Sequence, residues 1–202
     1  RQLFYETGDL FPEFAANLGG GQNIFHFSYY GLFSPVILLS YLFPFIRMDH
    51  YLMAASAAEL VFSAWLFYYW LGQKGFSKEI RAFVSVLFLL AGPMIYHSCH
   101  QLMFVNYMPF LCMALLGVDR HLKENRSGLY ILGILLMILS SFYFSICGML
   151  VLGFYGFSQY VSQEQSFRSG KFFKDAFSFL FPMVTAVLMS GLLLVPTAFA
   201  LL

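Results

Sequence analysis

Charged side chains are scarce in this chain of 202 residues, which has 11 Lys and Arg and 10 Asp and Glu. They make up 10% of the sequence, whereas a soluble domain has roughly 25%. Hydrophobic residues account for 60% and aromatic residues for 20%. This composition excludes an ordinary soluble domain and predicts an integral membrane protein. The formal net charge is only +1, so nucleic acid is not an expected partner.

Cysteine is rare as well, and its three positions form no recognisable motif. Cys99, Cys112 and Cys147 are odd in number and lack metal-ligand spacing, which excludes a disulfide framework. The glycine run at residues 19–21 lacks the Lys-Ser/Thr pair that completes a phosphate-binding P-loop. We therefore predict neither a metal site nor a bound cofactor.

A hydrophobic run long enough to cross a membrane is missing before residue 51. Pro35 and Pro44 leave about eight residues between them, roughly 12 Å of helix. A hydrocarbon core is about 30 Å thick, so this segment cannot span it. Ser34 followed by Pro35 is typical of a helix start. We expect a short helix that lies on, or dips into, one leaflet.

The rest of the sequence predicts an all-α, polytopic membrane protein. Residues 129–160 are too long for one span, and the polar break at residues 140–145 predicts a hairpin of two shortened helices with its apex inside the membrane. A second break, at Gly92-Pro93, interrupts one of the other spans. Those other spans are expected within residues 51–71, 80–96, 102–118 and 177–202.

The distribution of basic residues predicts the orientation. Nine of the 11 Lys and Arg lie in three connections, at residues 72–81, 119–128 and 159–175. The positive-inside rule places such connections in the cytoplasm. The opposite, extracytoplasmic face then receives Asp9 and Glu13, together with four of the five histidines. Groups suited to acid–base or phosphate chemistry therefore collect outside.

Several polar residues are candidates for a site on that face. The alternative for the stretch containing Asp9 and Glu13 is a connecting loop whose glycines only permit tight turns. His97 and His100 are three positions apart, so they lie on one side if this turn is helical and are candidates for binding a phosphate. The alternative is that both are interfacial residues wetted by lipid headgroups. Arg47 follows the short helix and marks the water boundary.

Two further polar residues lie inside predicted spans. Glu59 is about 12 Å below the outer end of its span, where a carboxylate is costly unless it faces a partner or a wet cavity. A neutral carboxyl bonded to a neighbouring helix is the alternative role. For Asn106 an interhelical hydrogen bond is the favoured interpretation, and substrate binding is the other.

Five segments in this order resemble the bacterial YfhO family of membrane proteins, which belong with the GT-C glycosyltransferases. The resemblance extends over nearly the whole chain. It implies that a first membrane helix precedes residue 1 and that more helices and an outer domain follow residue 202. From the sequence pattern, we expect residues 1–50 to form an extracytoplasmic loop with a short interfacial helix and residues 51–202 to form a transmembrane helical domain. The segments are GDLFPEF, GGGQNIFHFSYYGLFSPVILLSYLFP, AGPMIYHSCHQLMFVNYMPFLCMALLGVDR, ILSSFYFSICGML and SGLLLVPTAFALL.

The family implies transfer of a sugar from a polyprenyl-phosphate carrier to a wall polymer or lipid acceptor on the outer face of the cell membrane. The position that matches the essential acidic residue of such enzymes is Asp9, with Glu13 as the fallback. Arg47, His97 and His100 are expected to bind the donor phosphate, by position rather than by a family motif. The family often has an acidic residue near the position of Asn106, and this chain departs from that pattern because it has an amide there. The competing hypotheses are a lipid or polymer flippase or transporter, and a noncatalytic membrane subunit.

Overall fold

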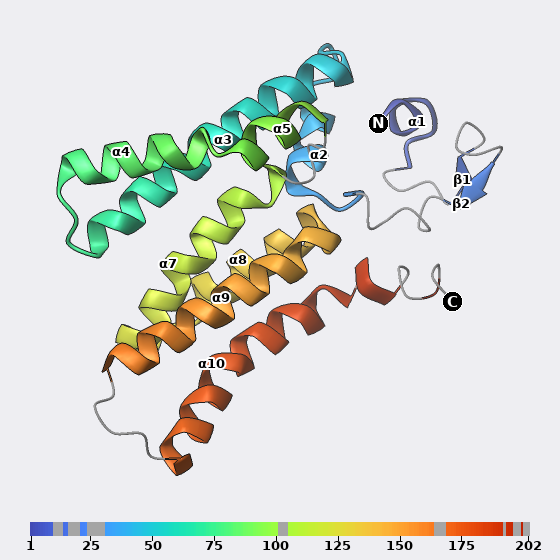
Figure 1. Ribbon diagram of the computed structural model, residues 1–202. Coiled ribbons are helices and arrows are strands. Elements are labelled where there is room, and N and C mark those ends of the chain that lie inside the picture. Colours follow the sequence, from blue (N-terminus) through green and yellow to red (C-terminus); the bar gives the residue numbers. More distant parts are fainter. Residues whose placement is uncertain are drawn as a thin grey trace.

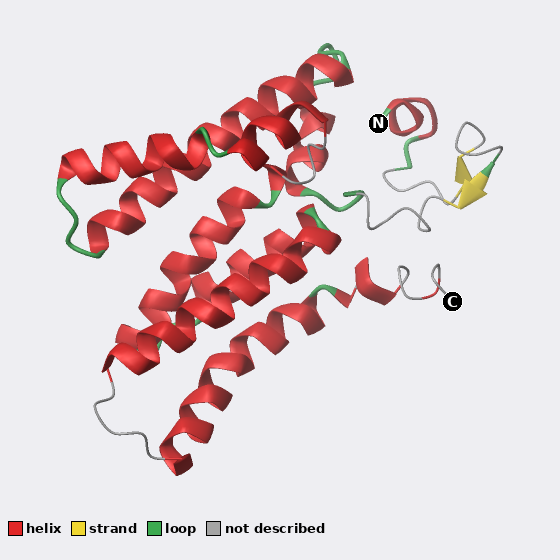
Figure 2. Cartoon of the chain, viewed as in Figure 1, coloured by secondary structure: helices red, strands yellow, loops and turns green. Residues whose placement is uncertain are grey.

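The computed structural model describes residues 1–9, 14–15, 21–23, 31–100, 105–163, 169–191, 193–195 and 199. It confirms the all-α prediction, and its regular strands are two short segments that pair antiparallel near the N-terminus (Figures 1 and 2). The elements are α1 (Gln2–Thr7), β1 (Phe14–Ala15), β2 (Gln22–Asn23), α2 (Pro35–Leu39), η2 (Ser40–Leu42), α3 (Met48–Gln73), α4 (Lys78–Leu89), α5 (Gly92–His100), α7 (Met108–Glu124), α8 (Gly128–Ser140), α9 (Phe142–Gln163) and α10 (Ser169–Met189).

The predicted short helix is confirmed as α2 followed directly by the 3₁₀ turn η2. Pro35 occupies the first helical position, where its missing N–H costs nothing. Ser34 precedes it, although its hydroxyl makes no capping hydrogen bond. The Tyr51 hydroxyl donates to the Val36 carbonyl at 2.7 Å and fixes α2 against α3.

Helix α3 is the clearest membrane span, since its 26 residues extend for roughly 39 Å. Helices α4 and α5 meet at a 49° bend just before Gly92-Pro93, which confirms the predicted break. Within the described residues, α3 and α9 are each long and apolar enough to cross a membrane. The bent pair is a third crossing if it counts as one span.

The third predicted span ends later than expected. Helix α7 continues through Glu124, so the predicted loop from Asp119 onward is mostly helical. Asn125 ends the helix in a left-handed conformation at φ 56°. The positive charge of Lys123 in the last turn also suits the negative end of the helix dipole. A sequence reading that breaks helices at charged residues misses this extra turn and a half.

The predicted hairpin is confirmed as α8 and α9, separated by an extended residue at Ser141. Only one arm is shortened: α8 has 13 residues, roughly 20 Å, whereas α9 has 22 and is a candidate span. The prediction of two shortened helices is therefore wrong for α9. Helix α10 also begins eight positions before the predicted start at residue 177, and it contains Pro182.

The core lies where α7 packs against α8, the closest helix pair of the bundle. Glycines permit this approach, because a Cβ at Gly117 would lie 2.5 Å from the Tyr130 backbone and one at Gly133 would lie 2.8 Å from Ala114. Helix α3 packs on the other side of α7, and α10 packs against α8.

The bundle has two chemically different ends (Figure 1). The α3–α4 and α7–α8 turns, the end of α9 and the start of α10 lie at one end, and the described basic residues in these turns and helix ends lie there with them. Helix α1, the start of α3 and the α8–α9 break lie toward the opposite end. The predicted clustering of basic connections is thus realised in three dimensions.

Candidate functional site

A charged groove of about 600 Å³ lies at the end of the bundle opposite the basic connections. We call it the N-terminal groove. Helix α1 forms one wall, and the segment leading into α3 forms the other. Its described lining residues are Arg1, Tyr5, Glu6, Pro44, Arg47, Met48 and Asp49.

Helix α1 is held in place by hydrogen bonds to the segment after α2. The Arg1 guanidinium donates to the carbonyl oxygens of Ser40 and Phe43, both at 3.3 Å, and of Ile46 at 2.5 Å. The Ser40 and Phe43 carbonyls also accept the N–H groups of Phe43 and Ile46, so Arg1 binds a segment that is already folded into turns. Tyr5 donates to the Tyr41 carbonyl in addition. Hydrogen bonds to the backbone of the segment after α2 therefore hold α1 in place as one wall of the groove.

The charges in the N-terminal groove are balanced. Arg47 donates to Asp49 through Nη2 to Oδ2 at 2.9 Å and through Nε to Oδ1 at 3.3 Å. Both side chains are largely exposed, at 77% and 54%, so solvent screens the pair and it contributes little to stability. A phosphate at Arg47 would have to displace the Asp49 carboxylate, which is a small cost at this exposure. Glu6 adds a second carboxylate to the groove.

Asp9 lies directly after α1, beyond a turn that requires glycine. Gly8 ends the helix at φ 81°, and its N–H donates to the Phe4 carbonyl at 2.8 Å. The Asp9 side chain is exposed and is not among the described lining residues of the groove. Glu13 lies outside the described residues. The predicted roles of both carboxylates stay predictions.

The two histidines lie on α5, which is helical through His100 and so gives them the predicted spacing of one turn. His97 is half-buried, and its ring centroid lies 6.4 Å from that of Phe144 at the start of α9. Phe144 in turn stacks on Tyr107 at 5.9 Å. The His100 side chain lies outside what the structure describes. His97 thus joins an aromatic cluster, while donor binding by either histidine stays a prediction.

Glu59 and Asn106 are both buried, with 7% and 5% of their surface exposed. Ser56 on α3 donates to the Asn106 side-chain oxygen at 3.5 Å, which is a long hydrogen bond. It links α3 to the segment just before α7. This contact agrees with the interhelical role favoured for Asn106. Glu59 is not among the described lining residues of the N-terminal groove. Substrate binding by Glu59 and Asn106 stays a prediction.

One polar cluster was missed in the sequence. Asp119, expected in an aqueous loop, is buried and accepts hydrogen bonds from Lys74 Nζ at 2.7 Å and the Tyr155 hydroxyl at 2.5 Å. The Lys74 ammonium also lies 5.7 Å from the centre of the Trp70 ring. Trp70 belongs to α3, Lys74 directly follows that helix, and Asp119 and Tyr155 belong to α7 and α9. Asp119 is 45 positions from Lys74 and 36 from Tyr155, so no local sequence pattern indicates these contacts.

Among the residues that the structure describes, no three His, Cys, Asp or Glu side chains gather as a metal-binding group. Of the described groove residues, only Arg47 was predicted as a site residue. Arg1, Tyr5 and Glu6 lie at the start of α1 and along it, but only the folded chain brings that helix to Arg47.

Of the comparisons with known proteins, the searches of curated proteins and of solved structures found no match. A family model described as "Bacterial membrane protein YfhO" matches residues 1–202, which include the groove, the hairpin and the bent helix pair. With that full-length match and its apolar helical bundle, the chain belongs to the YfhO family of bacterial membrane proteins.

Proposed function

We propose that this protein is a membrane glycosyltransferase that moves a sugar from a polyprenyl-phosphate carrier to a wall polymer or lipid acceptor. The observation that carries the proposal is the separation of the two ends: basic connections lie at one end, with Asp9 and the charged groove toward the other. The positive-inside rule then puts the groove on the extracytoplasmic side. Family membership supports a glycosyltransferase-like role.

In the proposed reaction Asp9 is the general base. Its carboxylate takes the proton of the acceptor hydroxyl while that oxygen attacks the anomeric carbon of the donor sugar. The bond from the anomeric carbon to the phosphate oxygen breaks, and polyprenyl phosphate leaves with the electron pair. Arg47, with His97 and His100, stabilises the leaving phosphate. Exchange of Asp49 for this phosphate at Arg47 is feasible because the ion pair is exposed.

The test uses full-length protein in vesicles with a radiolabelled polyprenyl-phosphate sugar and extracted wall polymer. Asp9→Asn keeps the size of the side chain and removes the basic oxygen, so transfer should fall about 10²-fold. Glu124→Gln is the matched control, since Glu124 is an exposed carboxylate in the α7–α8 region at the other end of the bundle. Its transfer should equal that of the parent.

Other outcomes reassign the role. Normal transfer by Asp9→Asn with loss in Glu13→Gln would move the base to Glu13. Normal transfer in both variants would remove this stretch from the mechanism, and absence of transfer by the parent with every donor would contradict the proposal itself.

A flippase or transporter is the second candidate, favoured by the 49° bend between α4 and α5 and by the buried Glu59. The two functions differ in what they need. A flippase moves a fluorescent lipid-linked sugar across a vesicle bilayer without any acceptor, whereas a transferase leaves it in its leaflet until an acceptor is added. A noncatalytic subunit does neither when purified alone.

A further inference from the structure

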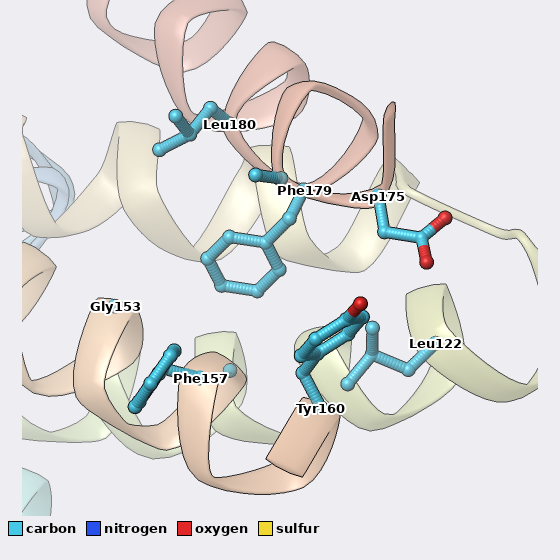
Figure 3. Close-up of a pocket in the computed structure, with 9 residues that line it drawn as sticks. Leu122, Gly153, Phe157, Tyr160, Asp175, Phe179 and Leu180 are labelled. Atoms are coloured by element: carbon cyan, nitrogen blue, oxygen red, sulfur yellow. The ribbon is translucent and has the colours of Figure 1, made fainter. Parts of the chain in front are cut away.

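A second pocket, of about 200 Å³, lies between α9 and α10 (Figure 3). It is near the end of α9 and the start of α10, at the end of the bundle that holds the basic connections. It is therefore separate from the N-terminal groove. Leu122 of α7 closes one side of it, and Phe179 of α10 lies over its middle.

A missing side chain creates this pocket. At Gly156 the ring of Phe179 fills the space, because a Cβ there would lie 2.4 Å from that ring. At Gly153, one turn earlier on α9, a Cβ would meet nothing within 4 Å. Helix α10 takes its main packing from α8 rather than from α9. The space beside Gly153 therefore remains open between the two helices.

The pocket has an apolar side and a polar side. Gly153 and Phe157 lie at one side, and Phe157 is 56% exposed to the surroundings of the bundle. The Tyr160 hydroxyl and the Asp175 carboxylate lie at the other side. No basic side chain is among its described lining residues. An anionic headgroup would meet the Asp175 carboxylate at close range, which is unfavourable.

The surroundings of the pocket indicate what enters it. Helix α9 is a candidate membrane span, and its neighbouring outward side chains are apolar, so we expect hydrocarbon chains around this part of the bundle. A hydrocarbon chain matches the apolar side. An ammonium group matches Asp175 and Tyr160, since both oxygens accept its hydrogen bonds. The exposed Lys174, next to Asp175 in α10, offers a cation to a phosphate.

We propose that the pocket between α9 and α10 binds a phospholipid with a primary-ammonium headgroup, such as phosphatidylethanolamine, with one acyl chain beside Gly153 and the ammonium at Asp175. This ligand is zwitterionic and differs from the anionic polyprenyl phosphate of the proposed reaction. The inference does not rest on the proposed function, and it holds for a transporter or a noncatalytic subunit equally.

The first experiment measures occupancy. Full-length protein in lipid nanodiscs is irradiated with a phosphatidylethanolamine that carries a diazirine in its acyl chain, and labelled peptides are identified by mass spectrometry. Labels should fall on the peptides containing Phe157 and Phe179. Gly153→Leu fills the pocket and should reduce this labelling about tenfold, a change of about 1.4 kcal/mol in binding. Val151→Leu adds volume at a 48% exposed site of the same helix and should leave it unchanged.

The second experiment tests the headgroup. Unlabelled phosphatidylethanolamine should compete about tenfold better than phosphatidylglycerol in the parent, as expected for hydrogen bonds to a charged group. Asp175→Asn should remove this preference while acyl-chain labelling persists. If Gly153→Leu fails to fold, the Asp175→Asn variant and the labelled peptides of the parent still test the proposal.

Three results would overturn the proposal. They are undiminished labelling in a Gly153→Leu variant that unfolds at the parent temperature, equal competition by phosphatidylglycerol in the parent, and cross-links from this pocket to a second copy of the chain in place of lipid.

Discussion

At the scale of single residues, the most consequential polar contact lies away from the candidate site. Lys74 and Asp119 are 18% and 3% exposed at their side chains, and their ion pair joins the residue directly after α3 to α7. Tyr155 adds a link to α9. Removing one partner of such a pair leaves the other charge buried and unpaired, which is far more costly than removing both.

We expect Lys74→Met to lower the free energy of unfolding by about 3–5 kcal/mol. The double variant Lys74→Met, Asp119→Leu should lose much less, because no charge is then left buried. Thermal or denaturant unfolding in detergent measures both. The exposed pair of Arg126 and Glu124, at 3.7 Å, is the control, and its disruption should change stability by no more than about 0.5 kcal/mol. Equal losses at the two pairs would contradict the buried role of Lys74.

At the scale of helices, close backbone approach determines the core. Helices α7 and α8 meet at Gly117 and Gly133, and the short α8 is held against α7 along its buried side. Lipid tails surround helices in a membrane, so dispersion contacts between closely packed helices are a main source of their stability. Separating the two backbones therefore lowers the stability of the helix pair.

Gly117→Ala should therefore destabilise the bundle by about 1–3 kcal/mol, because the new methyl group would lie 2.5 Å from the Tyr130 backbone. Gly128→Ala is the matched control in the same helix pair. A Cβ there meets nothing within 4 Å, and unfolding should stay within about 0.5 kcal/mol of the parent. A stable Gly117→Ala variant would show that α7 and α8 can separate at no cost.

At the scale of the whole molecule, the two ends of the bundle differ in charge and in what they hold. The basic connections share one end with the pocket between α9 and α10, and the N-terminal groove lies at the other. If the positive-inside rule holds for this chain, the two pockets lie on opposite sides of the membrane.

We test this orientation with single cysteines in a background without the native ones. Asp9→Cys should react with a membrane-impermeant maleimide in intact cells, because the side chain is exposed at the groove end. Lys123→Cys, exposed at the other end, should react only after the membrane is opened. Labelling of Lys123→Cys in intact cells, with Asp9→Cys protected, would reverse the orientation and with it the proposed outer site.

Local sequence patterns predicted most helices of this protein, the breaks between them and the family, although not the ends of α7 and α10 or the length of α9. Pro35, Gly92-Pro93 and the serines near Ser141 act on the backbone of their own neighbours, so their effects can be predicted without knowing the fold. The clustering of basic residues in three connections is likewise a property of the sequence, and the bundle brings these connections together at one end.

Tertiary structure alone decided which polar groups meet. Asp119 was assigned to water by its charged neighbours, yet Lys74 and Tyr155 from distant helices hold it in the interior. Arg1 belongs to the groove because it binds carbonyls 39 to 45 positions away, and no local pattern specifies such a contact. The pocket beside Gly153 exists because α10 packs on α8. That packing depends on side-chain contacts along the whole length of both helices.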